Sequence, residues 1–380
     1  MILEPFLIEV DDEVLSDLRR RVLATRWPPP APGPAWGQGT DPGYLQRLLA
    51  HWSDGFDWRA EERRLNRVHQ FRAKVDGVTI HFVHERAAGG PGIPLLLLHG
   101  WPSCFVELLP LVGLLTDPGH HGIDGPAFDV VVPSLPGYGF SERPRRGNYR
   151  DIAALLHGLM QGLGYARFGA GGGDFGAGVA TVMALDHPES MLGIHLSTLE
   201  LSPHIDDASR ALSDAERTYM EQQERWERTE RGYSAVQSTK PQTLAYALND
   251  SPAGLAAWIL EKWRSWTDSS GDLDRRFTRE FLLTMLTVYW VTGSITTSMR
   301  DYYDNRWDGV TVGPETFITV PTGVANFANE FVPEGRPPRE WAERLYNVCR
   351  WTEMPRGGHF APAEEPQLLA ADIAAFFAKL

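Results

Sequence analysis

The strongest chemical signal in the chain is the stretch Ala-Gly-Gly-Gly-Asp-Phe-Gly-Ala-Gly at residues 170–178. One acidic residue, Asp174, stands between glycines where an apolar segment passes into a predicted helix. This Gly-x-Asp-x-Gly pattern is typical of a nucleophile elbow, a strained strand-to-helix turn that holds one side chain above a sheet. Glycines flank such a turn because a Cβ atom would clash with the sharply folded backbone. Asp174 is therefore a candidate nucleophile.

The residue type at this turn indicates the chemistry. Serine is the usual occupant, whereas a carboxylate attacks a saturated carbon and forms an alkyl ester. No Gly-x-Ser-x-Gly occurs in the sequence, so a serine esterase would have no elbow to use. The pattern favours displacement at carbon over cleavage of a peptide or an ester.

Two other interpretations of the motif stay open at this point. Gly171, Gly173 and Gly176 also fit the dinucleotide fingerprint G-x-G-x-x-G, which needs an acidic residue about 20 positions later. Glu200 is the nearest candidate and lies slightly too far along the chain. Alternatively, the segment is a plain glycine-rich turn in which Asp174 caps the following helix.

Composition excludes several classes of protein. The chain has 380 residues, of which 43% are hydrophobic, and can bury a large core. Its net charge of -13 argues against a nucleic-acid partner. Apolar runs such as 94–98 are too short to span a bilayer, and the first residues do not resemble a signal peptide. We therefore expect a soluble, cytoplasmic protein without a membrane or nucleic-acid partner.

Cysteine usage argues against disulfides and structural zinc. Only Cys104 and Cys349 are present, and they form no Cys-x-x-Cys pair. We predict neither a metal nor a cofactor. The 13 tryptophans and 17 phenylalanines suit an apolar pocket lined by aromatic rings, although most such rings pack in a core.

The elements expected around the motif alternate between strand and helix. Apolar runs typical of buried strands occupy residues 78–84, 94–98, 128–133, 192–196, 317–320 and 348–351. Helical patterns lie between them, for example at 152–163 and 368–377. The alternation predicts a doubly wound α/β fold with a mostly parallel sheet. In such sheets, functional groups collect beyond the carboxyl ends of the strands.

A nucleophile, an acid and a base follow successive predicted strands. Asp174 comes first, Glu330 follows the penultimate strand, and His359 follows the last within Arg-Gly-Gly-His-Phe. This is the chain order of the α/β-hydrolase triad. Glu334 and Glu340 lie close to Glu330 and are alternatives for the acidic member.

The sequence divides into four segments. Residues 1–75 predict a helical arm wrapped over a larger domain, and residues 76–199 and 314–380 carry the α/β core. Residues 200–313 interrupt the alternation with helical patterns rich in tryptophan and tyrosine. An insertion after the sixth strand is where a lid would cover the strand ends and exclude water. An ordinary helical subdomain is the alternative.

Nearly the whole chain resembles the epoxide hydrolases of the microsomal type. Four of the matching segments belong to the arm and the first part of the core or to its end: residues 18–28, His-Gly-Trp-Pro at 99–102, the elbow at 172–174 and Arg-Gly-Gly-His-Phe at 356–360. The others are residues 237–241 and 248–257 of the helical insertion and Pro-Thr-Gly at 321–323. The resemblance implies an α/β-hydrolase fold and hydrolysis of an apolar epoxide to a vicinal diol through an aspartyl ester.

The resemblance also assigns roles to residues of the matching segments. The implied catalytic group consists of the nucleophile Asp174, the base His359, its acidic partner Glu330, and the lid tyrosines Tyr233 and Tyr302. Tyr303 adjoins Tyr302 and is an alternative for the second tyrosine. We expect the backbone N–H groups of Trp101 and Phe175 to form the oxyanion hole. His99, Pro102 and Trp226 are the expected substrate-binding residues.

Two departures from the family and several alternatives remain. Phe175 stands where many relatives carry tryptophan, and no membrane anchor precedes the arm, which favours a soluble, bacterial-type member. A haloalkane dehalogenase would use the same triad but would need N–H donors for a halide. A non-catalytic ligand-binding protein is the alternative from another class.

The expected partners are an epoxide and water, with a homodimer left open. Natural-product formation, including enediyne-type pathways, and xenobiotic turnover are both compatible with the sequence.

Overall fold

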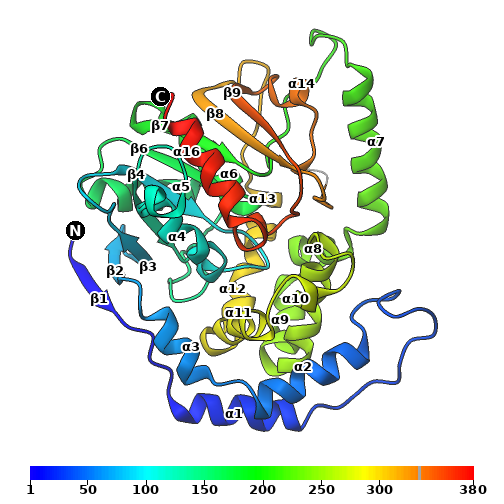
Figure 1. Cartoon of the computed structure of the whole chain (residues 1–380). Coiled ribbons are helices and arrows are strands. Elements are labelled where there is room, and N and C mark those ends of the chain that lie inside the picture. The colour runs from blue at the N-terminus through cyan, green and yellow to red at the C-terminus, as the bar shows by residue number, and fades with distance from the viewer. Residues whose placement is uncertain (333–334) are drawn as a thin grey trace.

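A nine-stranded sheet runs through the computed structural model, which describes residues 1–332 and 335–380 (Figure 1). Its strands are β1 (Leu3–Phe6), β2 (Gln70–Val75), β3 (Val78–Glu85), β4 (Ile93–Leu98), β5 (Phe128–Pro133), β6 (Phe168–Gly172), β7 (Met191–Leu196), β8 (Ile318–Phe327) and β9 (Tyr346–Met354). They lie in the order β1-β2-β3-β5-β4-β6-β7-β8-β9. The pairs from β5 to β9 are parallel, and the pairs that join β1, β2, β3 and β5 are antiparallel. The predicted α/β fold with a mostly parallel sheet is confirmed.

Helices cover both faces of this sheet because its central strands are apolar on both sides. Every residue of β5 is buried, as are the last four residues of β4. One face packs against α5 (Tyr149–Gly162) and α6 (Phe175–Asp186). The other face packs against α4 (Leu109–Thr116), α15 (Ala361–Glu364) and α16 (Pro366–Phe377). A short helix, α14 (Arg339–Ala342), precedes β9.

A helical insertion separates β7 from β8. Its helices are α7 (Asp214–Thr229), α8 (Gly232–Thr239), α9 (Pro241–Asp250), α10 (Pro252–Trp266), α11 (Arg279–Thr292), α12 (Ser294–Ser298) and α13 (Arg300–Trp307). Figure 1 shows α8 to α12 gathered beside the sheet, whereas α7 stands apart at the edge of the molecule. The insertion follows the seventh strand in chain order, not the sixth.

The N-terminal segment is only partly helical, because it also contributes the strands β1 and β2 to the sheet. The helices α1 (Asp12–Leu23), α2 (Pro42–Asp54) and α3 (Trp58–Leu65) pack on α10 and α11 of the insertion. In addition, β1 and β2 extend the sheet at one edge. The sequence patterns predict neither strand: β2 lies in the segment predicted as a helical arm, and β1 has four residues, includes a proline and is largely exposed, as edge strands often are.

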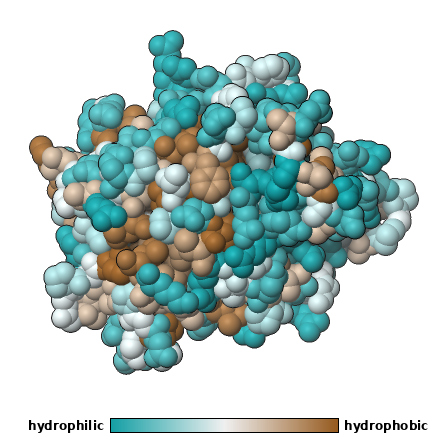
Figure 2. Space-filling view, turned by 90° about the horizontal axis from the view of Figure 1, so that it is seen from above, coloured by the Kyte–Doolittle hydropathy of each residue, from teal (hydrophilic) through white to brown (hydrophobic). Residues whose placement is uncertain are grey.

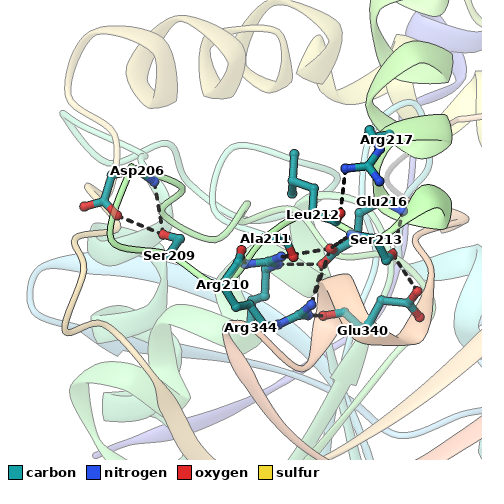
Figure 3. A network of polar contacts seen from close by, with 10 residues as sticks. All are labelled: Asp206, Ser209, Arg210, Ala211, Leu212, Ser213, Glu216, Arg217, Glu340 and Arg344. Carbon is teal, nitrogen blue, oxygen red and sulfur yellow. Dashed lines mark hydrogen bonds and ion pairs between the residues drawn. The ribbon is translucent and has the colours of Figure 1, made fainter.

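A buried ionic network fixes the start of α7 to the core (Figure 3). The carboxylate of Glu216 accepts hydrogen bonds from Arg344 Nη2 at 2.8 Å and from Arg210 Nη2 at 3.0 Å. Ser213 caps the helix, and its hydroxyl donates to Glu340 Oε1 at 2.8 Å. Hydrogen bonding to Arg344, which outweighs the cost of burial, lowers the pKa of Glu216 to about 2.

Glu216→Ala is expected to lower the free energy of unfolding by about 3–5 kcal/mol, because it leaves the buried Arg344 without its counter-charge. Since the pKa of Glu216 is depressed in the folded state, this contribution is present above pH 4.5 and is lost as the pH falls toward 2. Urea unfolding measures the change. Glu224→Ala is the control, because its pair with Arg228 on the same helix is exposed and contributes little. A loss no larger than that of the control would contradict the role of Glu216.

The surface seen in Figure 2 is mainly hydrophilic, with apolar residues in separate patches. Among residues 1–332 and 335–380, no helix combines the length and the apolar character that crossing a membrane requires.

Candidate active site

Asp174 occupies the turn between β6 and α6, at the carboxyl end of β6. Its backbone angles are φ 49° and ψ −137°, a strained conformation for a residue with a side chain. A Cβ atom on Gly172 would lie 2.6 Å from the carbonyl oxygen of Leu98, and a Cβ atom on Gly176 would meet the same atom. The neighbouring strand β4 thus requires glycine on both sides of Asp174. An ordinary N-cap residue needs no such strain, so the geometry favours the nucleophile elbow.

Two backbone N–H groups hold one oxygen of the Asp174 carboxylate. Trp101 N donates to Oδ1 at 2.8 Å and Phe175 N donates to the same oxygen at 2.7 Å. The other oxygen, Oδ2, lies 3.5 Å from Nε2 of His359. The two residues predicted to form the oxyanion hole therefore bind the same oxygen, Oδ1. The other oxygen, Oδ2, receives no hydrogen bond from them.

The backbone of the elbow is held by a second, polar contact. Asp174 N donates to Thr198 Oγ1 at 2.7 Å, and this hydroxyl donates to Glu200 Oε1 at 3.1 Å. Glu200 thus supports the turn through Thr198, which differs from the ribose-binding role that the dinucleotide interpretation would give it.

His359 lies between two carboxylates. Its Nδ1 is 3.1 Å from Glu330 Oε2, and its backbone N–H donates to Trp266 O at 2.9 Å. Glu330 is fixed in turn, because its Oε1 accepts from Val332 N at 2.8 Å. Burial alone would lower the pKa of His359, but the charges of Glu330 and Asp174 outweigh it and hold this pKa well above its ordinary value.

The structure distinguishes Glu330 from one of its two alternatives. Glu340 lies at α14, where it accepts a hydrogen bond from the hydroxyl of Ser213. Glu334 lies outside the described residues. Of the acids in this region that the structure describes, Glu330 is the one in contact with His359.

Two tyrosines of the insertion meet above the elbow. Tyr233 of α8 and Tyr302 of α13 have ring centroids 5.8 Å apart, and both rings pack on Trp101. Burial, together with the nearby Tyr233 and Asp174, raises the pKa of Tyr302 well above its ordinary value, so its hydroxyl keeps its proton. Tyr303 is 42% exposed and its ring lies beside Trp307. The geometry therefore favours Tyr302 over Tyr303.

These side chains line a chamber of about 300 Å³. Asp174, Phe175, Trp226, Tyr233 and Tyr302 form part of its wall. Trp226, predicted to bind substrate, is thus in place. The chamber joins Asp174 to a space large enough for a small organic molecule.

Two other residues predicted to bind substrate do not line this chamber. His99 is buried, its Nε2 accepts a hydrogen bond from Leu135 N, and its Nδ1 lies 3.3 Å from Gly100 O. Pro102 is also buried, and its carbonyl accepts a hydrogen bond from Trp263 Nε1. A substrate contact of His99 or Pro102 stays a prediction, since backbone contacts occupy the ring of His99, which lines the small cavity beside Asp174 and His359, and packing covers Pro102.

A second cavity of about 20 Å³, the size of one water molecule, lies behind the elbow. Its wall includes Asp174, His359 and Glu107. Glu107 lies in the 3-10 turn Phe105–Leu108 after β4 and is buried, and burial raises its pKa to about 7. The sequence analysis missed Glu107. The available signal was an acidic residue within the apolar run Phe-Val-Glu-Leu.

The described residues contain no group of three or more His, Cys, Asp or Glu side chains arranged to hold a metal ion.

Comparison with known proteins identifies the family. Residues 3–108 match the epoxide hydrolase N terminus, and residues 93–248 match the alpha/beta hydrolase fold. Epoxide hydrolase 1 of Sus scrofa is 38% identical, over 100% of this chain and 89% of that protein. The structure of Aspergillus niger epoxide hydrolase is 30% identical with a TM-score of 0.85, covering 100% of this chain and 97% of that one. Juvenile hormone epoxide hydrolase from the silkworm Bombyx mori is 28% identical with a TM-score of 0.88, covering 100% and 94%.

The fold and the site thus define an enzyme of the α/β-hydrolase class. More narrowly, the chain belongs to the epoxide hydrolase family of the microsomal type, as its resemblance in sequence predicted. It is an epoxide hydrolase, and a covalent aspartyl intermediate is general to this family.

Proposed function

We propose that Asp174 attacks one carbon of an epoxide through Oδ2 and forms an alkyl ester, while Tyr233 and Tyr302 hydrogen-bond the ring oxygen and one of them gives it a proton. The observation that carries this proposal is the asymmetric carboxylate. Oδ1 is fixed by the N–H groups of Trp101 and Phe175, so it becomes the carbonyl oxygen of the ester without moving. The two phenols stand across the chamber from it, where the leaving oxygen would develop charge.

In the second step, His359 removes a proton from water, and the resulting hydroxide attacks Cγ of the Asp174 ester. Glu330 orients the imidazole and stabilises its positive charge. Esterification removes the negative charge of Asp174, which lowers the pKa of His359 and makes the imidazole a better base at that stage. The tetrahedral oxyanion forms on Oδ1, between the two N–H groups that already bind it, and the diol leaves.

Labelled water tests this route. In a single turnover in H₂¹⁸O with excess enzyme, we expect the label to enter the carboxylate of Asp174 and to be almost absent from the diol. Label reaches the diol only in later turnovers, because the attacked carbonyl carbon belongs to the enzyme. Peptide and product mass spectrometry measure both. Label in the diol at the first turnover would mean direct attack of water on the epoxide.

We also propose that the cavity behind the elbow holds the hydrolytic water, with Glu107 as an acceptor for its second proton. Glu107→Gln is expected to slow hydrolysis of the ester about tenfold to a hundredfold and to leave its formation unchanged. Because the pKa of Glu107 is raised to about 7, the acceptor is ionised above this pH and is lost as the pH falls below it. Rapid-quench mass spectrometry separates the two steps. Equal slowing of both steps would indicate a general structural defect and would contradict the proposal.

We propose a bulky, apolar or aromatic epoxide as the substrate, because Tyr149, Phe175, Trp226, Tyr233 and Tyr302 place aromatic rings in the chamber wall, beside polar and charged side chains. We propose that the helical insertion acts as a lid, because it supplies both tyrosines and covers the strand ends. We propose a cytoplasmic location, which the two free cysteines support. Turnover of a panel of small and bulky racemic epoxides, with chiral analysis of the diols, would separate a biosynthetic intermediate from broad xenobiotic substrates. Parallel assays for halide release test the dehalogenase alternative.

A further inference from the structure

Lys262 is a buried lysine next to a tyrosine of the site. The chain has four lysines, and the other three, Lys74, Lys240 and Lys379, are exposed. The side chain of Lys262 is only 10% exposed, and its Nζ lies 4.8 Å from the centroid of the Tyr233 ring. Burying an ammonium group is costly unless it has partners, so this position calls for a physical reason.

Lys262 lines a groove next to the chamber that contains Asp174. A groove of about 1120 Å³ between the N-terminal segment and α10 is lined by Lys262, Glu261 and Tyr233. Tyr233 also lines the chamber that contains Asp174. The ring of Tyr233 is thus part of the wall of both spaces, with the nucleophile on one side and the ammonium group close to the other.

We propose that Lys262 is a positioning residue for the ring-opening step, in which its ammonium group stabilises the negative charge that Tyr233 acquires on giving its proton to the epoxide oxygen. This inference rests on the proposed function. A cation is attracted to the electron-rich face of a phenol, and the attraction grows when the ring becomes a phenolate. An interaction that is stronger in the transition state than in the ground state lowers the barrier.

The step balances in the following way. A bond forms between Oδ2 of Asp174 and an epoxide carbon while the bond from that carbon to the ring oxygen breaks. The electron pair passes to the ring oxygen, which takes the proton of the Tyr233 hydroxyl. Tyr233 is left as a phenolate beside Lys262. In the second step, the proton that His359 takes from water passes to the diol oxygen that leaves Cγ of Asp174, and the other proton of that water is returned through solvent and restores the phenol.

Other charged groups near the pair favour a fixed, charged lysine. Glu261 forms an ion pair with Lys262, and its side chain is 24% exposed, so water screens its charge more than that of the lysine. Burial raises the pKa of Glu230, and Lys262 opposes this shift, which places the ammonium group near a second carboxylate. Arg264 and Asp268 are the other charged groups of the groove. The other titratable or charged groups of the chamber are Tyr149, Asp174, Glu200, Glu227, Arg231, Tyr302 and Arg306.

The test compares Lys262→Met, which removes the charge and keeps the length of the side chain, with Lys262→Arg, which keeps the charge. Lys240→Met removes an exposed charge from the same insertion and serves as the control. Rapid-quench mass spectrometry with styrene oxide in single turnover measures the formation and the hydrolysis of the ester separately. We expect Lys262→Met to slow ester formation about tenfold and to leave ester hydrolysis unchanged. Lys262→Arg restores most of the rate, and Lys240→Met has no effect.

The pH profile separates this role from a structural one. Ester formation requires protonated tyrosine and declines at alkaline pH. Without the cation the phenolate is less stable, so this decline moves to higher pH in Lys262→Met and not in Lys262→Arg. Lys262→Gln is the second neutral variant, to be used if the methionine variant does not fold.

Several results would overturn the inference. They are unchanged ester formation in the neutral variants, equal slowing of both steps, or an alkaline decline that does not move. A wild-type enzyme that forms no ester with any epoxide would instead refute the proposed function itself. Normal ester formation in both wild type and Lys262→Met refutes only the role of Lys262.

Discussion

Replacing His359 by glutamine is expected to slow hydrolysis of the aspartyl ester by about 10³-fold and so to trap it. Ester formation needs the carboxylate of Asp174 and the two tyrosines, none of which this change removes. The imidazole acts only afterwards, when a water molecule must lose a proton. Intact-protein mass spectrometry after mixing with an epoxide should therefore show a mass increase equal to the mass of the epoxide.

Asp174→Ala is the matched control, because it removes the attacking oxygen and should give neither adduct nor diol.

The same experiment in wild type predicts how the rate of ester hydrolysis depends on pH. Hydrolysis needs neutral His359, whose pKa is raised in the free enzyme by Glu330 and Asp174 and falls when Asp174 is esterified. As the pH falls through the pKa of His359 in the ester, hydrolysis slows and the adduct accumulates. Turnover of His359→Gln at the wild-type rate would remove this residue from the mechanism.

The sequence predicts those parts of the site that depend on local rules. Asp174 stands out because the turn needs glycine at fixed positions, and the structure shows that Leu98 of the neighbouring strand excludes any Cβ at two of them. The central strands stand out because burial on both faces requires continuous apolar runs. His359 and Glu330 then follow from the order in which parallel strands end at one edge of the sheet.

The parts that were missed or wrong depend on distant contacts. Glu107 is predicted by no motif, since its importance comes from facing His359 and Asp174 across a small cavity. Lys262 lies on a helix where a lysine is ordinarily solvent-exposed, and only packing places it over Tyr233. Nor does the sequence around His99 show that its Nε2 accepts a hydrogen bond from the backbone N–H of Leu135.

Replacing both Tyr233 and Tyr302 by phenylalanine is expected to reduce ester formation by about 10³-fold to 10⁴-fold, the largest loss short of removing the nucleophile. Ring opening without a proton donor would leave an alkoxide that neither phenol can protonate or hydrogen-bond. Either single variant keeps one donor and should lose about tenfold to a hundredfold, so the two losses are not expected to add simply. Single-turnover mass spectrometry measures the rate of adduct formation.

Tyr303→Phe is the control for this experiment, because Tyr303 adjoins Tyr302 in the chain but is exposed beside Trp307. Its rate should equal that of wild type. Because burial holds the pKa of Tyr302 well above its ordinary value, the wild-type rate should stay level through neutral pH. Phenylalanine keeps the ring contacts with Trp101, so a loss in the double variant reports the hydroxyl groups and not a collapsed chamber. A double variant within tenfold of wild type would mean that the ring oxygen takes its proton from another donor. The two phenols would then have no catalytic role in ring opening by the carboxylate.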